Sequence, residues 1–508
     1  MPRTISLDGQ RLTRRDFFAV VLRNHPVDLS PRARQAMRKS RAWVEKIIAE
    51  NQLVYGVTTG VGSLSTEHID PAAARELQLN VVRSHSCGVG EPLGDAETRG
   101  LLLLRANTLA RGLSGVRPLI AEMLCAFLNH GVHPVVPRRG SVGASGDLAP
   151  LAHVALALVG EGEVTFRALR QPASAALKAL GIKPLTLEAK EGLSLVNGTQ
   201  AMLSLGLLAL RGAEILVNTA DVSGALSLDA LRGSTRAFDE RLHAARPHPG
   251  QMVSARNLAR LNHGSSINKS HEGCSRVQDA YSLRCMPQVH GAVRDALGYA
   301  ARVFEIEMNS ATDNPLVFAS AGEVISGGNF HGQPLALALD FMALALTQLG
   351  AIAERRVDRM VNPLTSELPP FLTRSPGLES GLMIAQVAAA ALASENKVLA
   401  HPASADSIPT SGNKEDFVSM GMAAALKLQP IIANVRNILA IELLCACQAL
   451  DLLVPLRSGK LAEQAKALVR KVSPHIAKDR PLHADIARLS DLISEGTLAD
   501  LISPERQA

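Results

Sequence analysis

Two long apolar stretches most constrain the fold that this 508-residue chain can adopt. They cover residues 335–353 and 439–456, and both consist mainly of alanine, leucine and other aliphatic residues. Each stretch also contains carboxylates: Asp340 lies in the first, and Glu442 and Asp451 lie in the second. Because a charged side chain is costly inside a bilayer, these stretches suit helices buried in a protein core better than membrane-spanning helices.

The low aromatic content favours the same fold class. Hydrophobic residues make up 47% of the chain but aromatic residues only 3%, so its apolar side chains are mostly aliphatic. Alanine and leucine favour helices, whereas aromatic and β-branched residues favour strands. We therefore predict a mainly α protein with a central bundle of long near-antiparallel helices and only short hairpins. We expect an N-terminal domain over residues 1–200 and a central and C-terminal helical bundle over residues 201–508.

Local signals near the N-terminus predict where the first elements begin. Thr13, with Asp16 three residues later, is typical of a helix start, and so is Ser30 followed by proline. The Asp-Gly pair within residues 5–12 predicts a hairpin there. These signals place one hairpin and two helices ahead of the first glycine-rich loop.

Charge and cysteine content disfavour several classes of function. The net charge is +6, but the basic residues are dispersed and do not alternate with aromatic residues, which disfavours nucleic-acid binding. The six cysteines form no Cys-x-x-Cys pair, so we expect reduced thiols rather than disulfides or a zinc site. The first ten residues lack the apolar core of a signal peptide. We expect a cytoplasmic protein with no metal site and neither a nucleic-acid nor a membrane partner.

A glycine-rich loop at residues 140–150 carries the first chemical signal. Its core reads Gly-Ala-Ser-Gly-Asp, with Ala144, Ser145 and Gly146 at the centre. Because glycine reaches backbone angles that other residues avoid, the Gly146 amide nitrogen can approach the Ala144 carbonyl carbon. Attack there, with loss of the Ser145 hydroxyl as water, would make an electrophile from the backbone. The alternative is an ordinary glycine-rich turn before a helix capped by Asp147.

Four further segments carry polar or aromatic residues in specific patterns. They are Tyr-Gly-Val-Thr-Thr-Gly at 55–60, Asn-Gly at 197–198, Gln-Asp-Ala-Tyr-Ser-Leu-Arg-Cys at 278–285 and Gly-Gly-Asn-Phe at 327–330. The first reads as a loop, because its glycines and threonines suit neither a helix nor a strand interior. Arg284 offers a planar fork that suits a carboxylate, and Tyr281 offers a phenol that can donate or accept a proton. Taken alone, each could instead be a structural residue.

Together these segments resemble the histidine and aromatic amino acid ammonia-lyases, from about residue 55 to about residue 420. The resemblance implies the ammonia-lyase (fumarase/aspartase-like) superfamily fold. It also implies the cofactor 4-methylidene-imidazol-5-one (MIO), formed autocatalytically from Ala144, Ser145 and Gly146 with no external cofactor. Finally, it implies a homotetramer whose active sites combine residues from three protomers.

The same resemblance implies a role for each candidate site residue. The catalytic residues would be Tyr55 on a mobile loop as the base, the MIO-forming Ala144, Ser145 and Gly146, and Tyr281 as a second proton-transfer group. The implied substrate-binding residues are His85, Asn197, Gln278, Arg284, Phe330 and Glu415. Arg284 and Asn197 would hold the substrate carboxylate, and Phe330 would shield the cofactor from water. His85 and Glu415 would face the substrate side chain.

Residues expected near that side chain give a divided signal for the substrate. Patterns similar to the histidine enzymes occur at Ser84, His85, Ser326, His331 and Glu415. Patterns more similar to the tyrosine or phenylalanine enzymes occur at Arg83, Gln333, Lys414 and Phe417. Glu415 has the most weight, because a buried carboxylate is a good partner for an imidazole but is costly against a phenyl ring. The predicted enzyme is thus a carbon-nitrogen lyase of histidine metabolism that converts L-histidine to urocanate and ammonia.

Other functions stay open at this point. A tyrosine or phenylalanine ammonia-lyase would use the same catalytic residues, and Glu415 could bind a phenol hydroxyl. An aminomutase would also use them, but would add the ammonia back at the β-carbon. A catalytically silent scaffold would keep the fold, although the intact Ala144, Ser145, Gly146 and Tyr55 argue against it. Glu415 could also simply favour the dipole of a predicted helix over residues 413–420.

Overall fold

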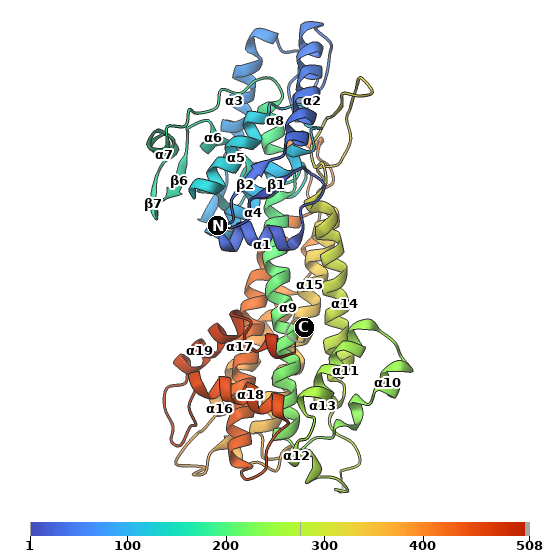
Figure 1. The fold of residues 1–508 in the computed structure, drawn as a ribbon, viewed down its shortest axis with the longest axis vertical. Coiled ribbons are helices and arrows are strands. Elements are labelled where there is room, and N and C mark those ends of the chain that lie inside the picture. Colours follow the sequence, from blue (N-terminus) through green and yellow to red (C-terminus); the bar gives the residue numbers. More distant parts are fainter. Residues whose placement is uncertain (1, 275, 503–508) are drawn as a thin grey trace. The chain divides into compact units, whose positions relative to one another are not determined.

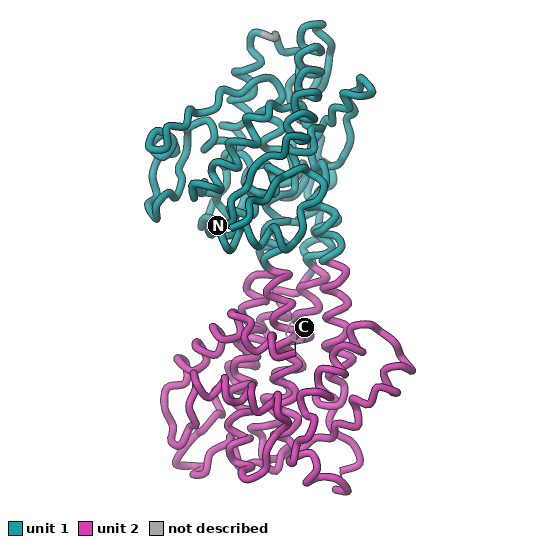
Figure 2. Tube along the Cα trace, in the orientation of Figure 1, with its two compact units in different colours: residues 1–208, 301–339, 402–426 teal, residues 209–300, 340–401, 427–508 magenta. Residues whose placement is uncertain are grey.

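The protein is mainly helical in its computed structural model, which describes residues 2–274 and 276–502 (Figure 1). Its contacts divide the chain into two compact units, which Figure 2 shows in different colours. Unit 1 comprises the residues up to 208, together with 301–339 and 402–426. Unit 2 comprises residues 209–300, 340–401 and those from 427 onward. The division of the sequence at residue 200 remains a prediction.

Four long helices have residues in both units. They are α9 (Gln200–Ala230), α14 (Met286–Met308), α15 (Gln333–Val361) and α17 (Gly421–Leu452). Helices α9, α15 and α17 are long and apolar enough to cross a membrane by length and composition. However, 72%, 61% and 72% of their respective most apolar windows are buried inside the protein, so their aliphatic side chains contribute to its core.

Unit 1 combines short strands with helices of moderate length. Its strands are β1 (Ile5–Leu7), β2 (Val27–Leu29), β3 (Val89–Pro92), β4 (His133–Pro134), β5 (Pro137–Arg139), β6 (Glu163–Phe166), β7 (Leu169–Pro172), β8 (Leu316–Phe318) and β9 (Glu323–Ile325). Its other helices are α1 (Arg14–Arg23), α2 (Pro31–Ala49), α3 (Ala74–His85), α4 (Asp95–Ala110), α5 (Pro118–His130), α6 (Leu148–Leu158), α7 (Ala173–Leu180) and α8 (Glu191–Val196). The strands form small sheets with the orders β1-β2, β3-β5, β4-β6-β7 and β8-β9. The β6–β7 and β8–β9 pairs are antiparallel hairpins.

Unit 2 consists of helices and loops within the part of the chain that the structure describes. Its shorter helices are α10 (Glu240–Ala244), α11 (Pro249–Leu261), α12 (Ser266–Lys269), α13 (Tyr281–Arg284), α16 (Met383–Leu399), α18 (Lys460–Val472) and α19 (His483–Ser494). Across both units the 3₁₀-helices are η1 (Gly62–Leu64), η2 (Pro71–Ala73), η3 (Thr235–Phe238), η4 (Pro370–Leu372), η5 (Ala403–Ala405), η6 (Ser411–Asn413) and η7 (Ala499–Leu501).

The N-terminal elements confirm two of the sequence signals and contradict the third. The Thr13 and Ser30 hydroxyls each accept a backbone N–H from the first turn of the helix that follows, as predicted. The predicted hairpin over residues 5–12 is wrong, because β1 pairs in parallel with β2 after the chain has passed through α1. The Asp8 carboxylate accepts the N–H groups of the two residues after Gly9, and the Gly9 N–H donates to a side chain of α4. These bonds direct the chain toward α1 instead of back along β1.

A buried ion pair joins two helices of the unit 2 core. The guanidinium of Arg356 on α15 donates from two nitrogens to the carboxylate of Glu442 on α17, and both side chains are fully buried. Ser223 and Ser227 on α9 donate to the same carboxylate at 2.8 and 2.7 Å. The Glu442 charge is therefore matched by one cation and two hydroxyls, which a buried carboxylate requires.

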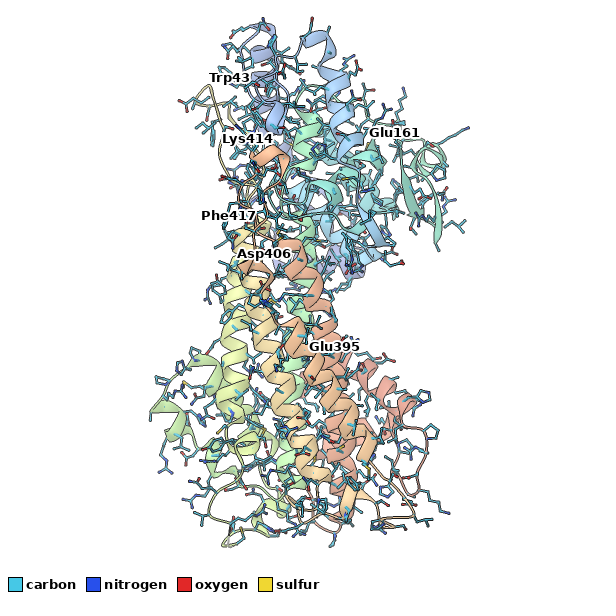
Figure 3. All side chains as sticks on the ribbon, turned by 180° about the vertical axis from the view of Figure 1, so that it is seen from behind. Trp43, Glu161, Glu395, Asp406, Lys414 and Phe417 are labelled. Atoms are coloured by element: carbon cyan, nitrogen blue, oxygen red, sulfur yellow. The ribbon has the colours of Figure 1, made fainter. Side chains whose placement is uncertain are left out.

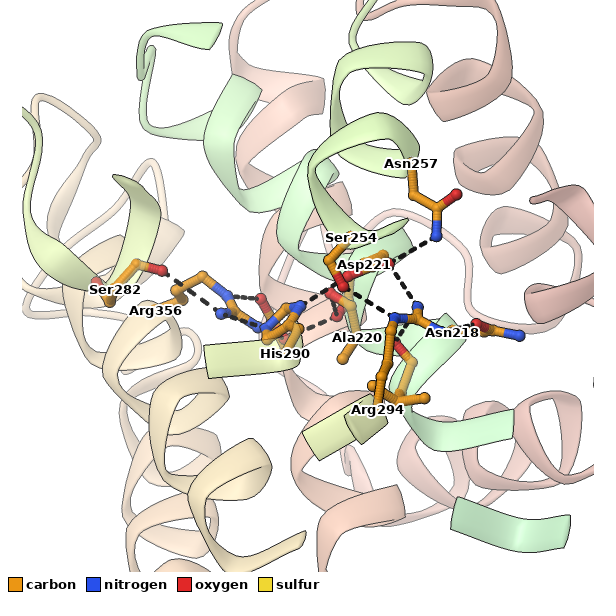
Figure 4. Close-up of polar contacts among 12 residues, drawn as sticks. Asn218, Ala220, Asp221, Ser254, Asn257, Ser282, His290, Arg294 and Arg356 are labelled. Atoms are coloured by element: carbon orange, nitrogen blue, oxygen red, sulfur yellow. Dashed lines mark hydrogen bonds and ion pairs between the residues drawn. The ribbon is translucent and has the colours of Figure 1, made fainter. Parts of the chain in front are cut away.

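The same network continues to a second buried carboxylate, shown in Figure 4. Asp221 on α9 lies 2.8 Å from His290 Nδ1 and accepts hydrogen bonds from Arg294 at 2.6 Å and from Asn257 at 2.9 Å. His290 Nε2 faces Arg356 Nη1 at 3.4 Å. Burial lowers the pKa of His290, so a neutral ring that donates from Nδ1 and accepts at Nε2 satisfies both neighbours. The negative charges of Glu442 and Asp221 are thus balanced by the positive charges of Arg356 and Arg294 inside this helical core.

We expect Glu442→Leu to lower the free energy of unfolding by about 3–5 kcal/mol, because it leaves the buried Arg356 without its counter-ion. Denaturant unfolding followed by circular dichroism measures this loss. The control is Glu163→Gln, which removes one partner of a solvent-exposed ion pair with Arg170 and should leave the unfolding midpoint unchanged. A loss below about 1 kcal/mol for Glu442→Leu would contradict the argument.

Candidate active site

Unit 1 contains a cavity of about 1130 Å³ that collects most of the predicted site residues. The predicted residues that line it are Tyr55, His85, Ala144, Ser145, Asn197, Phe330 and Glu415. They come from segments that are up to 360 residues apart in sequence, namely from Tyr55 to Glu415. These seven predicted residues therefore line one cavity.

The cavity wall at Ala144 and Ser145 depends on a very close backbone contact. Gly146 has a φ of +76° and forms a bridge with Gly198. A Cβ atom on Gly146 would lie 2.0 Å from the Gly198 carbonyl oxygen, so no larger residue fits. This explains the glycine after Ser145 by both its backbone angle and the lack of space.

Asp147 fastens the same loop to the start of α9. It is fully buried, and its Oδ2 accepts the N–H groups of Ala201 and Met202, both at 2.9 Å. Ser141 Oγ donates to the other carboxylate oxygen at 3.1 Å. The alternative interpretation, in which this side chain caps α6, is wrong, because Asp147 accepts N–H groups of α9 instead. Burial raises the pKa of Asp147 to about 7 in spite of these hydrogen bonds.

Glu415 lies in the cavity wall in direct contact with Ser145. Ser145 Oγ donates to Glu415 Oε1 at 2.7 Å, and the hydroxyls of Thr410 and Ser411 donate to Oε2 at 2.7 and 3.0 Å. The predicted helix over residues 413–420 is wrong, since α17 begins only at Gly421. Glu415 instead pairs with Thr410 in a short bridge, so it belongs to a loop and serves the cavity rather than a helix dipole.

A hydrogen bond between the Gly62 backbone and the Tyr55 side chain joins the two ends of the Tyr55 loop. The Gly62 N–H donates to Tyr55 Oη at 3.0 Å, and both residues line the cavity. Gly62 has a φ of +59° and begins η1. A fixed donor at the phenol oxygen stabilises negative charge there, which is the property a phenol base needs.

The residues near the expected substrate side chain come from two segments. His85 is the last residue of α3, and its Nδ1 lies 3.1 Å from Ser84 Oγ. Lys414 and Phe417 also line the cavity and belong to the loop that precedes α17 (Figure 3). The Phe417 ring stacks on His331 with centroids 6.1 Å apart, and Phe417 O lies 3.1 Å from His331 Nε2. Phe417, which departs from the pattern of the histidine enzymes, thus packs against His331, which matches that pattern.

Four predicted residues do not line this cavity: Gly146, which directly follows the lining residue Ser145, and three residues of another segment. Gln278, Tyr281 and Arg284 belong to unit 2. Tyr281 is 71% exposed, and the Arg284 guanidinium lies over its ring at 4.7 Å. Arg284 Nε is buried without a hydrogen-bond partner, which leaves a donor available for an anion. Tyr281 and Arg284 therefore contact each other outside the cavity lining.

Sequence reasoning missed several polar lining residues, among them Asn80, which is exposed, and Asn314, which is buried. Asn80 lies on the α3 face that also carries Leu77, Val81 and Ser84. Helical spacing from Ser84 could have identified this face, because residues three, four and seven apart share one side of a helix. Asn314 gave no such signal, since it lies in a loop.

The described residues contain no group of three or more His, Cys, Asp or Glu side chains that could hold a metal ion. The polar groups of the cavity lining are three carboxylates, two imidazoles, a lysine ammonium, a phenol, amides and hydroxyls. Such a site can bind a polar small molecule and transfer protons to or from it.

Comparison with known proteins assigns the chain to a family. A family model described as aromatic amino acid lyase matches residues 12–471. Histidine ammonia-lyase from Koribacter versatilis (strain Ellin345) is 58% identical over 98% of this chain and 99% of its own length. The relative of the same description from Anaeromyxobacter sp. (strain K) is 53% identical over 97% of this chain and 99% of its own.

Solved structures give the same fold. Histidine ammonia-lyase from Trypanosoma cruzi superposes with a TM-score of 0.92 at 42% identity, covering 99% of this chain and 95% of that one. Tyrosine aminomutase from Streptomyces globisporus superposes with a TM-score of 0.93 at 41% identity, covering 99% and 98%. The mainly α ammonia-lyase fold is thus confirmed, and the protein is a carbon-nitrogen lyase. The chain belongs to the aromatic amino acid lyase family.

Proposed function

We propose that this enzyme eliminates ammonia from L-histidine and releases urocanate. The observation that carries this proposal is Glu415, a carboxylate on the cavity wall whose Oε2 is held by the hydroxyls of Thr410 and Ser411. A carboxylate positioned in this way is a strong acceptor for an imidazole N–H. The relatives that are 51–58% identical and described as histidine ammonia-lyases support the same substrate. Tyrosine or phenylalanine elimination and an aminomutase reaction are the alternatives.

We propose MIO, formed from Ala144, Ser145 and Gly146, as the electrophile. The residues present fit this group: the Gly198 contact holds the Gly146 backbone, Ala144 is 5% exposed, and a hydrogen bond fixes the Ser145 hydroxyl. Once formed, such a group would supply the electrophile that converts an amine into a better leaving group.

The chain's own residues would do the rest of the chemistry. Tyr55, whose oxygen accepts the Gly62 N–H, would take the β-proton of the substrate as general base. Asn197 and Arg284 would hold the carboxylate, so that the C–H bond faces Tyr55. Tyr281 would transfer the proton at the amine nitrogen.

Further residues would orient the substrate and exclude water. Glu415 and His85 would bind the imidazole, and Phe330 would cover the reacting atoms. Gln278 would add a polar contact beside Tyr281. Glu415, His85 and Phe330 are assigned because they line the cavity. Gln278 is assigned from the family resemblance.

We propose a homotetramer in which neighbouring protomers complete each site. The support is that Tyr281 and Arg284 are absent from the cavity lining, while Tyr281 is 71% exposed and Arg284 Nε lacks a partner. We also place the enzyme in the cytoplasm, because the six cysteines are free thiols, as in a reducing compartment.

Shared sites predict that two inactive variants complement each other. Tyr55→Phe should lower kcat by about 10²–10⁴-fold, and Arg284→Lys should also lose activity because a point charge cannot replace the planar fork. Co-expression with two affinity tags yields mixed oligomers, and their histidine turnover should far exceed the sum of the two variants. The Tyr55→Phe, Arg284→Lys double variant, paired with itself, is the control. Mixed oligomers as inactive as their parents would mean that each protomer builds its own site.

Cofactor formation predicts a mass change. The mature chain should weigh less than its sequence by two water molecules, and Ser145→Ala should abolish both this deficit and the activity. Intact-mass spectrometry measures the deficit. Ser84→Ala is the control: it removes another hydroxyl from the cavity lining but should keep the deficit. An active enzyme with the unaltered sequence mass would exclude the MIO proposal.

The substrate proposal predicts a selective effect at Glu415. Wild-type enzyme should convert L-histidine to urocanate, and Glu415→Gln should reduce this turnover by at least about tenfold, since the charged acceptor for the imidazole is lost. Any turnover of tyrosine or phenylalanine should change far less. Product analysis by chromatography distinguishes unsaturated acids from β-amino acids, and Asp406→Asn, which lies outside the cavity lining, is the control. A wild type that converts tyrosine but not histidine would make the alternative correct.

A further inference from the structure

A fully buried ion pair lies next to the cavity residues Asn197 and Asn314. Lys190 Nζ lies 3.3 Å from Asp313 Oδ2, and both side chains are completely buried. Lys190 also donates to Ser194 Oγ at 2.8 Å. Neither member of the pair lines the cavity. A buried pair of this kind is weak evidence for stability, because desolvation offsets most of the attraction between the charges.

Asp313 contacts both cavity asparagines. Its Oδ1 accepts the Asn314 N–H at 2.7 Å and lies 3.5 Å from Asn197 Nδ2. Asn197 Nδ2 also donates to the Asn314 carbonyl at 3.2 Å. The Asn197 amide is 4% exposed and therefore has its orientation fixed by these two acceptors.

Asn314 extends the connection to the turn that carries Phe330. Its Oδ1 accepts the Gly327 N–H at 2.8 Å and the Ser326 hydroxyl at 3.1 Å. Asn314 thus joins the Asn197 segment to the start of the Gly-Gly-Asn-Phe turn. Asn197 and Ser326 both line the cavity. Asn314 contacts both of them, and its N–H donates to Asp313.

A second cation keeps Asp313 ionised. Burial raises the pKa of Asp313, but Lys190 and Arg105 outweigh this effect and hold it below the usual value. Arg105 is also fully buried and donates to the Asn197 carbonyl at 2.8 Å. The Asn197 main chain and side chain are therefore held by charged partners from two directions.

We propose that the Lys190–Asp313 pair is a positioning device for the carboxylate-binding wall of the cavity. Through Asn314, it holds the Asn197 amide and the Ser326–Gly327 turn in one arrangement. Asp313 is a positioning residue, since it acts through Asn197 and does not line the cavity. This inference rests on the proposed function only in taking Asn197 as a contact of the substrate carboxylate.

The test is a double-mutant cycle on binding. Calorimetry measures the affinity of 3-(imidazol-4-yl)propionate, which has an imidazole and a carboxylate but no amine, for wild type, Asp313→Asn, Asn197→Ala and the combination. Asp313→Asn should weaken binding about tenfold in the wild-type background, because its amide cannot satisfy both Lys190 and Asn197. Its effect should be several-fold smaller when Asn197 is alanine, because only the route through Asn314 to the Ser326–Gly327 turn then remains. Equal weakening in both backgrounds would overturn the proposal.

A charge-free variant keeps the test valid if Asp313→Asn fails to fold. Lys190→Met with Asp313→Leu removes both buried charges together, which stability tolerates better than removal of one. It should unfold near the wild-type temperature but bind the ligand about tenfold more weakly. Wild-type affinity in this variant would overturn the proposal.

The chain offers a matched control. Lys427 and Asp340 form another largely buried Lys–Asp pair, and neither residue lines the cavity. Lys427→Met with Asp340→Leu should leave ligand affinity unchanged, whereas an equal loss would show that any buried pair has this effect and would overturn the proposal.

Failure of the proposed substrate is a separate outcome. If wild type binds 3-(4-hydroxyphenyl)propionate instead, histidine is the wrong substrate, and the same cycle with that carboxylate tests the positioning role. The two ligands share the carboxylate and differ only in the ring. Coupling between Asp313 and Asn197 with either ligand supports the inference, and its absence with the ligand that binds overturns it.

Discussion

The close contact between Gly146 and Gly198 is the constraint on which the active site depends. A Cβ atom at Gly146 would lie 2.0 Å from the Gly198 carbonyl oxygen, so the two backbones can meet only as glycines. Asp147 completes the junction by accepting two N–H groups at the start of α9. The Ala-Ser-Gly segment is thereby fixed beside Asn197, and the Ser145 hydroxyl reaches Glu415. Without this junction, the Ala-Ser-Gly segment and Asn197 would not share one cavity.

Buried charge has different consequences in the two units. In unit 2, Arg356 and Glu442 link α15 to α17, and their surroundings are other core side chains. In unit 1, Asp313 contacts Asn197 and Asn314, which line the cavity. Both pairs are fully buried and would cost free energy if one partner were lost. What distinguishes them is the next hydrogen-bonded residue, which belongs to the core in one case and lines the cavity in the other.

The site could be predicted largely from sequence because its chemistry requires unusual residue types. Tyr55, Ser145 and Phe330 lie in glycine-rich segments that no regular helix or strand would select, and these three do line one cavity. Asn314 was missed, because an asparagine in a loop has no periodic pattern. Gln278 was predicted from its motif, yet it lies in unit 2 and outside the cavity lining.

The sequence by itself determined the helical class, the helix starts at Thr13 and Ser30, and the chemical character of the cavity. These features depend on local propensity, capping and residue type, which short segments contain completely. Only the tertiary structure decided that β1 pairs with β2, that Asp147 caps α9, and that the Glu415 segment is a loop. In each case the deciding hydrogen bonds join groups that are distant in sequence, such as Ser145 and Glu415 at a separation of 270 residues. Hydrogen bonds formed in the tertiary structure then override the conformational preference of the local sequence.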